Sequence, residues 1–355
     1  MPRRFAVHKT ATTPAATSNQ ATAPKTRTAT PAPAPPAKAA AVRRRRASPE
    51  PPPQGAPAPS TPTDKADAAT PLGDALLRAA HDTRDSLDLE DTVTAIHKTR
   101  RALKGARALL MLVEGERRPA ARQLRRDLGA AAHSLASTRD RHIIHDAIAD
   151  LAAEKRRRPL DTALARKVAS TLTRRTEPHG EADGNLTALR EAGLSDGMAR
   201  AAQLADDMDA QDLPEALASG YRRARRAAYG IDPADAEALH ELRKHVVAHV
   251  CQMELAAPWW PRLGAIWLDE LQRLREMLGR HHDLEILLAR LDGAPGRLSP
   301  DHIATVMDAA SRRQRKLADK AMRHHARLFA ERPKAFCRRL AAYLEASVDH
   351  AENRE

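Results

Sequence analysis

The sequence predicts an all-α protein made of two pseudo-twofold-related four-helix bundles, a duplication, preceded by a disordered basic tail. From position 71 onward the chain is rich in Ala, Leu, Arg and Glu and poor in β-branched residues, a composition that favours helix. A pair of motifs recurs at a constant offset of 143 residues, which indicates duplication. Five prolines fall where helices are expected to begin, namely Pro119, Pro159, Pro233, Pro261 and Pro333.

Residues 1–70 differ from the rest of the 355-residue chain. They contain 14 of its 25 prolines and 11 Lys and Arg against 3 Asp and Glu, so they hold +8 of the formal net charge of +13. With hardly any large apolar side chains, this segment cannot bury enough surface to offset its ordering entropy. We expect a disordered tail whose run from Arg43 to Arg46 is either an electrostatic arm for a polyanion or part of a solubilising linker.

The helical region is expected to cover residues 71–350, with a first bundle at about 71–175 and a second at about 205–350. In the first half the pattern predicts helices at 72–86, 90–114, 119–137, 140–156 and 160–175. A glycine-rich joint at 176–200 is expected between the halves. In the second half helices are predicted at 185–210, 213–229, 234–256, 262–279, 282–292, 300–330 and 334–350.

Composition excludes several classes of protein. There is no run of 18 or more apolar residues, and the basic start is not followed by an apolar segment, so we expect neither a membrane span nor a secretory signal. Two cysteines cannot form a disulfide framework, which fits a reducing cytoplasm. Neither a P-loop nor a G-x-G-x-x-G motif occurs, so we expect no nucleotide cofactor.

The repeat is defined by two motifs. Residues 96–101 (Ile-His-Lys-Thr-Arg-Arg) match residues 239–244 (Leu-His-Glu-Leu-Arg-Lys) at an offset of 143. Residues 135–140 match residues 278–283 at the same offset. Because two motifs about forty residues apart share one offset, and that offset is about half of the 285 residues that follow the tail, we infer two copies of one helical bundle.

Each copy carries a cationic helix face. On an α-helix the cations of the first copy fall within a sector of roughly 120°, and they are His97, Arg100, Arg101, Lys104 and Arg107. The opposite face, from Ile96 to Val113, is apolar. The second copy repeats the cationic face with His240, Arg243 and Lys244. The copy is imperfect, because Val247 stands where the first copy has Lys104.

Two further groups are predicted to join this feature. One follows a single helix and comprises Tyr221, Arg222 and Arg225. The other is a stripe at spacings of three and four, comprising Arg312, Lys316, Lys320, Arg323 and Arg327. Acids that could form salt bridges are mostly missing from these faces, and like charges held together repel. A polyanion between facing cationic helices is therefore expected, bound by arginine forks and by histidines that gain a proton as it binds.

At His97-x-x-Arg100-Arg101-x-x-Lys104-x-x-Arg107 and His240-Glu-Leu-Arg243-Lys244 the sequence resembles the CHAD family, the conserved-histidine α-helical domains. The elements around Arg139-Asp140, His282-Asp283, Tyr221-Arg-Arg-x-Arg225 and Leu328-Phe-Ala-x-x-Pro333 are also similar, so the resemblance covers about residues 71–350. It implies two four-helix bundles around a basic central cavity that binds inorganic polyphosphate, with association with polyphosphate granules. Arg139 and His282 are then further expected contacts.

Three classes of function compete. We expect a non-enzymatic polyphosphate-binding module; the alternatives are a non-specific nucleic-acid-binding protein that uses the basic tail and helix faces, and a phosphoryl-transfer enzyme or polyphosphatase with a histidine acceptor. Cationic faces on helices expected to face each other favour polyphosphate over DNA. No carboxylates are expected beside them to hold Mg²⁺, which argues against an enzyme. We interpret His245 and His249 as packing rather than metal-binding residues, and Cys251 and Cys337 as small buried side chains.

Overall fold

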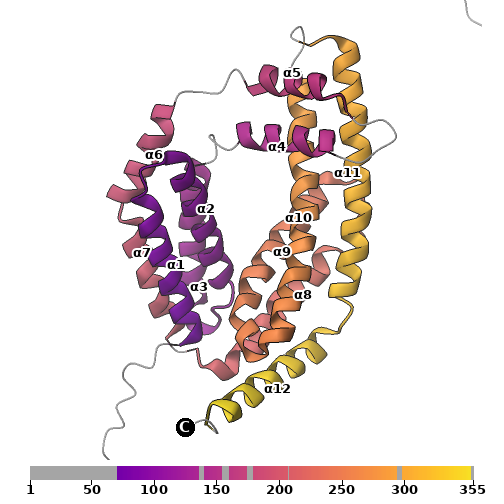
Figure 1. Ribbon diagram of the computed structural model, residues 1–355. Coiled ribbons are helices and arrows are strands. Elements are labelled where there is room, and N and C mark those ends of the chain that lie inside the picture. Colours follow the sequence, from indigo (N-terminus) through magenta and orange to yellow (C-terminus); the bar gives the residue numbers. More distant parts are fainter. Residues whose placement is uncertain are drawn as a thin grey trace, which may run out of the picture. The chain divides into compact units, whose positions relative to one another are not determined.

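The computed structural model describes residues 70–135, 140–153, 160–173, 179–206, 208–293 and 298–352, all within one compact unit, Asp64–Glu355. Within these ranges every regular element is helical, which confirms the all-α class (Figure 1). The predicted tail lies outside the described residues except for Thr70, and so does the predicted contact Arg139. None of the helices in the described part of the chain is both long and apolar enough to span a bilayer.

The first helices form where the sequence predicted them: α1 (Pro71–Leu87), α2 (Thr92–Leu109) and α3 (Arg118–Ser134). Side-chain caps fix the starts of the first two, because Thr70 Oγ1 accepts a hydrogen bond from Gly73 N (3.1 Å) and Asp91 Oδ2 accepts one from Thr94 N (2.9 Å). Helix α2 packs against both α1 and α3.

The expected glycine-rich joint at 176–200 and the single helix at 185–210 are both wrong. The described residues there form two helices, α6 (His179–Glu191) and α7 (Leu194–Ala202), and α7 packs against α1. Gly193 separates them at φ +63°, the left-handed conformation that ends a helix without strain for glycine alone. Glycines within a helix were therefore mistaken for a connection.

The second half contains α8 (Leu213–Ala227), α9 (Ala236–Ala256), α10 (Pro261–Asp292), α11 (Pro300–Leu328) and α12 (Pro333–Glu352). Consecutive helices from α8 to α11 pack against each other, and α12 returns to pack against α8. The predicted break near residue 280 is wrong, because α10 is continuous. Buried Leu278, His281 and Leu284 keep the helical period through the glycine at 279.

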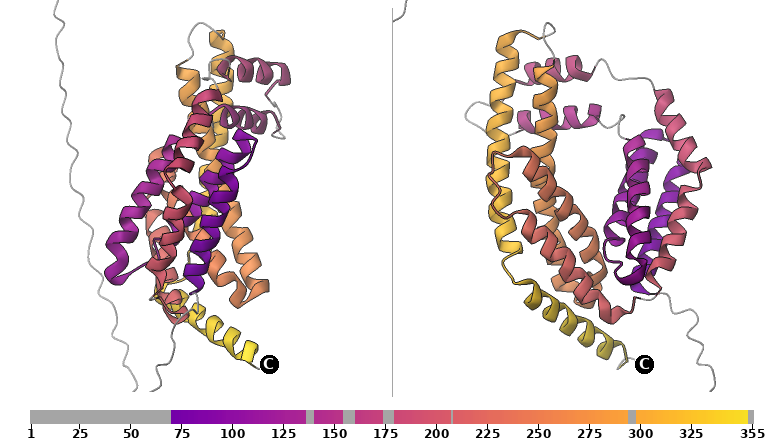
Figure 2. Two further views of the ribbon diagram at one scale, coloured as in Figure 1. Left: turned by 90° about the vertical axis from the view of Figure 1, so that its left-hand side faces the viewer. Right: turned by 180° about the vertical axis from the view of Figure 1, so that it is seen from behind.

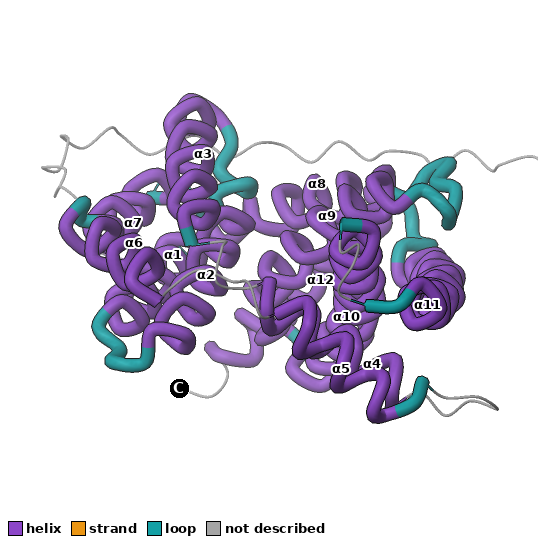
Figure 3. Tube along the Cα trace, turned by 90° about the horizontal axis from the view of Figure 1, so that it is seen from above, coloured by secondary structure: helices purple, strands orange, loops and turns teal. Residues whose placement is uncertain are grey.

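Helices α4 (Asp140–Ala153) and α5 (Thr162–Thr173) pack away from the first three helices. They lie beside α10 and α11 (Figures 2 and 3). The four helices share a separate apolar cluster that includes Ile148, Val168 and Leu287. Asp150 on α4 also pairs with Arg313 of α11 at 3.1 Å and Arg280 of α10 at 3.6 Å. The sequence assigned α4 and α5 to the first bundle, so two matching four-helix bundles are not confirmed by this packing.

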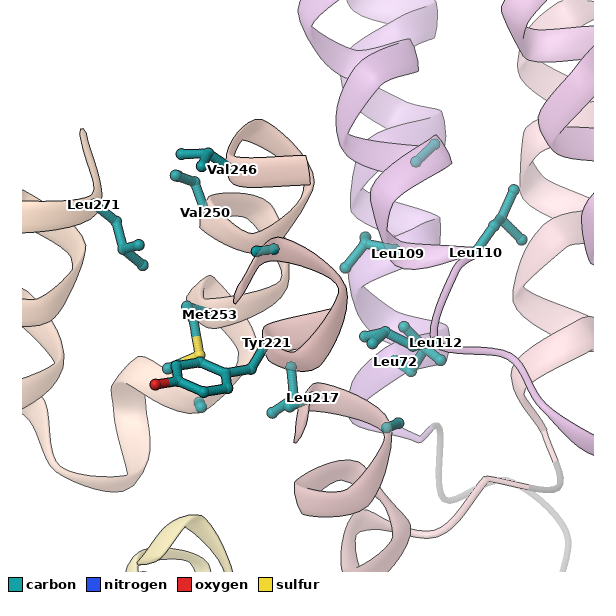
Figure 4. Packing of buried hydrophobic residues seen from close by; sticks show 14 of the residues in the cluster. Leu72, Leu109, Leu110, Leu112, Leu217, Tyr221, Val246, Val250, Met253 and Leu271 are labelled. Carbon is teal, nitrogen blue, oxygen red and sulfur yellow. The ribbon is translucent and has the colours of Figure 1, made fainter. Parts of the chain in front are cut away.

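One continuous core nevertheless joins both copies of the repeat. It includes Leu72, Leu109, Leu217, Val246 and Leu271, none more than 6 % exposed (Figure 4). Helices α2 and α9, which carry the two copies of the cationic motif, pack directly against each other within this core. Their apolar faces are buried as the periodicity predicts, and their remaining faces can carry function.

Candidate functional site

The second copy of the motif lies on α9, where its histidine meets a histidine of α10. The ring centroids of His240 and His282 are 4.2 Å apart, with the ring planes tilted by 38°. His282 Nδ1 in turn lies 3.1 Å from Glu285 Oε2. Both histidines are half-buried. The structure thus brings together two predicted contacts that are 42 positions apart in the sequence.

The surroundings of His240 favour its neutral form. Burial lowers its pKa most, and His282, Lys244 and Arg243 lower it further, while Glu285 opposes them. The Nδ1 atom of His240 is buried without a hydrogen-bond partner among the described residues. An anion beside this ring would therefore receive a hydrogen bond and favour the protonated imidazole.

The two other cations of the second copy differ in their surroundings. Arg243 is half-buried, and a Cβ atom built on Gly279 would lie 3.9 Å from its Nε, so this side chain runs close to the α10 backbone. Lys244 is exposed and pairs with Glu241, which corrects the expectation that acids are missing from this face. Because an exposed ion pair contributes little, a multivalent anion can replace Glu241 at low cost.

The first copy lies on α2, where its cations point in more than one direction. His97 and Arg101 are exposed, and Arg100 and Lys104 are half-buried. Arg100 Nη1 donates to the carbonyl of Ala132 near the end of α3 at 2.9 Å, which gives this arginine a structural role as well. Burial raises the pKa of the Glu254 carboxyl on α9, and the nearby charge of Arg101 opposes this rise.

Helices α2 and α9 contact each other near their C-terminal ends. Gln252 Nε2 of α9 donates to the carbonyl of Ala108 in α2 at 2.9 Å, within the core. A Cβ atom at Gly220 of α8 would lie only 2.1 Å from Gln252 Oε1, so only glycine leaves room for this bond. His97 lies eleven residues before Ala108 on α2, and His240 lies twelve residues before Gln252 on α9. Each motif therefore starts roughly 17 Å from this contact, measured along its own helix.

On α8 the structure corrects one predicted contact. Tyr221 has no exposed surface, its ring stacks on Phe336 at 4.1 Å, and its hydroxyl donates to the carbonyl of Glu331 at 3.0 Å. Burial raises its pKa to about 12. Tyr221 is therefore a core residue rather than a ligand contact. Arg222 and Arg225 are exposed, and Arg225 Nε donates to the carbonyl of Phe329 at 2.9 Å.

The stripe on α11 faces solvent. All five of its members are exposed, namely Arg312, Lys316, Lys320, Arg323 and Arg327. The helix packs against α10 and α4 through other residues, such as Val306, Ala310 and Ala321. Arg312 pairs with Asp308 one turn earlier, so this stripe also contains an acid that the sequence reading overlooked.

The packing interpretation of His249 is confirmed. It is fully buried between the rings of Tyr221 and Phe329, and burial lowers its pKa to about 3. Burial also raises the pKa of the Cys251 thiol to about 11, so it stays protonated at neutral pH.

A hollow of about 600 Å³ beside the α8–α9 turn is lined by Asp232, Asp235, Glu241 and other residues, and its carboxylates would repel a polyanion.

The structure places a further cation beside Arg107, which the sequence had already assigned to the cationic face of α2. Arg107 of α2 lies against α3, where a Cβ atom on Gly129 would be 3.4 Å from its Cζ, and Arg125 of α3 has Arg107 and Arg223 of α8 as charged neighbours. Arg107 follows from the repeated motif, but Arg125 and Arg223 lie on other helices at no spacing shared with it, so no sequence pattern links the three. Only the packing of the helices shows that they converge.

Comparison with known proteins gives one match. The family model for the CHAD domain matches residues 72–292, which is more than half of the chain. The match contains both copies of the cationic motif and ends at the last residue of α10, so α11 and α12 lie beyond it. No curated protein and no solved structure matches the chain significantly.

Proposed function

The chain belongs to the CHAD domain family, and from this premise we propose that it binds inorganic polyphosphate without catalysing a reaction. The observation that carries the proposal is the meeting of His240 and His282 beside Arg243 and Lys244, on two helices packed side by side. The first copy supplies a second cationic segment on α2, which packs against α9. Two such segments would hold successive phosphates of one chain.

The chemistry of these groups suits condensed phosphate. Arginine presents a planar fork of donors to two phosphate oxygens, and lysine adds a compact positive charge. His240 would contribute a donor and, once protonated, a further charge. This is recognition by charge and hydrogen bonding alone. We further propose that such binding directs the protein to polyphosphate granules in the cytoplasm.

Competition between two polyanions tests the proposal against nucleic-acid binding. Labelled polyphosphate is bound to the full chain and to residues 64–355, and duplex DNA is added to each. We expect DNA to compete weakly, and the affinity for polyphosphate to fall steeply and roughly linearly with salt on logarithmic axes. Equal competition by DNA on the shorter chain would favour a nucleic-acid-binding function of the helices. If DNA competes for the full chain but not for residues 64–355, DNA binding belongs to the tail.

Polyphosphate affinity should rise as the pH falls from about 8 to about 5.5. The pKa of His240 is below its ordinary value in the free protein, so the ring is neutral at pH 7. A bound polyanion raises that pKa, so the complex holds more protons than the free protein, and acid favours binding. The gain in affinity ends below the pKa that His240 has in the free protein, because His240 is then protonated both in the free protein and in the complex. His282, Lys244, Arg243 and Glu285 face this ring and set the range.

Titration calorimetry at a series of pH values checks this prediction. His240→Gln should flatten the dependence on pH, whereas His145→Gln, at an exposed histidine of α4, should leave it unchanged. A parental affinity that does not vary over this range would show that no histidine takes up a proton on binding.

A further inference from the structure

Helix α12 turns one long face away from the rest of the described helices. Its other side includes buried Phe336, Leu340 and Leu344 and packs against α8 and the short helix η5 (Ala257–Trp259). In Figure 1 the helix lies at the edge of the described helices. The face that points outward covers a sector of roughly 120°. Its residues, all exposed, are Lys334, Arg338, Ala341, Ala342, Glu345, Val348 and Asp349, and we call them the α12 outer face.

The charges of the α12 outer face are separated along the helix. The first half carries Lys334 and Arg338, and the second half carries Glu345 and Asp349. The positions three and four residues from Arg338 hold only lysine and alanine, and those around Glu345 hold alanine, valine and aspartate. Neither residue therefore has an opposite charge at the spacing that forms ion pairs within a helix. Both can pair with a charge on another helix.

This order of charges is the reverse of the one that stabilises a single helix. The partial positive charge at a helix N-terminus favours acids there, and the partial negative charge at the C-terminus favours bases. The first turn of α12 holds Lys334 and no acid, whereas Glu345 and Asp349 lie toward its C-terminal end. The stability of α12 by itself does not explain the order. A partner helix with the opposite order of charges does.

We propose that the α12 outer face is a docking surface for a second copy of this chain, whose α12 lies antiparallel to the first. A two-fold axis that passes between Ala341 and Ala342 places Arg338 of each copy opposite Glu345 of the other, because both residues are equally far from the axis. Each pair occurs twice, as an isologous contact requires. The small side chains at the centre let the two helices approach closely.

The remaining charges fit the same alignment. Lys334 of each copy lies opposite Asp349 of the other, so the four ion pairs extend over about 22 Å of helix. A parallel arrangement in register would instead place Arg338 against Arg338 and Glu345 against Glu345. Like charges across an interface repel, so the charges specify the antiparallel orientation.

An aromatic side chain borders the α12 outer face. The ring of Trp260, at the start of α10, meets that of Tyr343 edge-on at 4.9 Å between centroids, and Trp260 is 49 % exposed. Aromatic residues are enriched in protein–protein interfaces, and a second copy would cover part of this ring.

The size of the contact indicates a weak dimer. One pair of helices buries less than the 1,200–2,000 Å² of a standard interface, so we expect a Kd on the order of 10–100 µM. In a binding assay with dilute protein the chains are therefore single. The inference concerns a surface beyond the family match and does not depend on polyphosphate binding.

Analytical ultracentrifugation of the full chain, without polyphosphate and at concentrations below and above this Kd, tests the pairing. The parent should show a reversible monomer–dimer equilibrium that weakens with salt. Arg338→Glu and Glu345→Lys should each raise the Kd at least about tenfold, because each turns two attractive contacts into repelling ones. The double variant exchanges the charges and should dimerise like the parent. An equimolar mixture of the two single variants should form a mixed dimer, since every pair in it is attractive.

A charge-matched variant controls for net charge. Arg166 is exposed on α5, so Arg166→Glu makes the same change in charge as Arg338→Glu and should leave the dimer unchanged. A parent that stays monomeric at every concentration overturns the proposal. So does a dimer whose Kd neither single variant changes, or a double variant that fails to restore pairing while its circular dichroism matches the parent. Because polyphosphate is absent, none of these results bears on the site around His240.

Discussion

Replacing both Arg243 and Lys244 by alanine is expected to lower the affinity for polyphosphate by roughly 100-fold or more. A hydrogen bond to a charged group contributes about 1.5–3 kcal/mol, and each 1.4 kcal/mol corresponds to a factor of ten in Kd. The double substitution also leaves Glu241 without its lysine partner, which adds a repelling charge beside His240. Fluorescence anisotropy with polyphosphate of defined length, at fixed salt and pH, measures the change.

Helix α12 offers a control with the same change in net charge. Lys334 and Arg338 are exposed on adjacent turns of that helix, beyond the family match. Their double replacement by alanine should weaken binding by less than about threefold, because distant exposed charges are screened by salt. If both pairs reduce affinity equally, net charge and not the arrangement around His240 determines binding.

The repeated motif could be predicted from sequence because helical geometry fixes which residues share a face. Residues three or four apart lie together, so the apolar back of α2 and the stripe on α11 follow from spacing alone. The same reasoning failed at Tyr221. Its hydroxyl and its neighbouring arginines suggest a polar site, but its ring fills the space left by Phe336 and Phe329. Those residues are more than a hundred positions away, so no local pattern shows the contact.

Features that depend on contacts between distant helices could not be predicted. Helices α4 and α5 were assigned to the first bundle by their order in the chain, yet α4 packs against α10 and α11, and α5 packs on α4 and adds apolar residues to the same cluster. That Arg125 lies near Arg107 and Arg223 could not be predicted for the same reason, because the three residues belong to different helices. The arrangement of His240 and His282 lies between these cases. The repeat marks both segments, but only the packing of α9 on α10 places the rings in contact.

The part of the chain beyond the family match completes the core. Helices α11 and α12 follow the last matched residue, but Phe329 and Phe336 enclose Tyr221 and His249 from that side. Phe336 has no exposed surface, and the guanidinium of Arg339 lies 5.3 Å from its ring centroid. The family domain in this chain therefore depends on residues outside the match for its packing.

Phe336→Ala is accordingly expected to reduce the free energy of unfolding by about 3–5 kcal/mol. The substitution leaves a cavity against Tyr221 and removes the stacked pair of rings. This loss is large, because the whole free energy of unfolding of a domain is typically only about 5–15 kcal/mol. Urea unfolding followed by circular dichroism measures the loss. Val348→Ala, at a residue of the same helix that is 42 % exposed, should change stability by less than about 0.5 kcal/mol. An equally small effect of Phe336→Ala would mean that α12 does not pack on α8 in solution, and Tyr221 would then be accessible and would have to be reconsidered as a ligand contact.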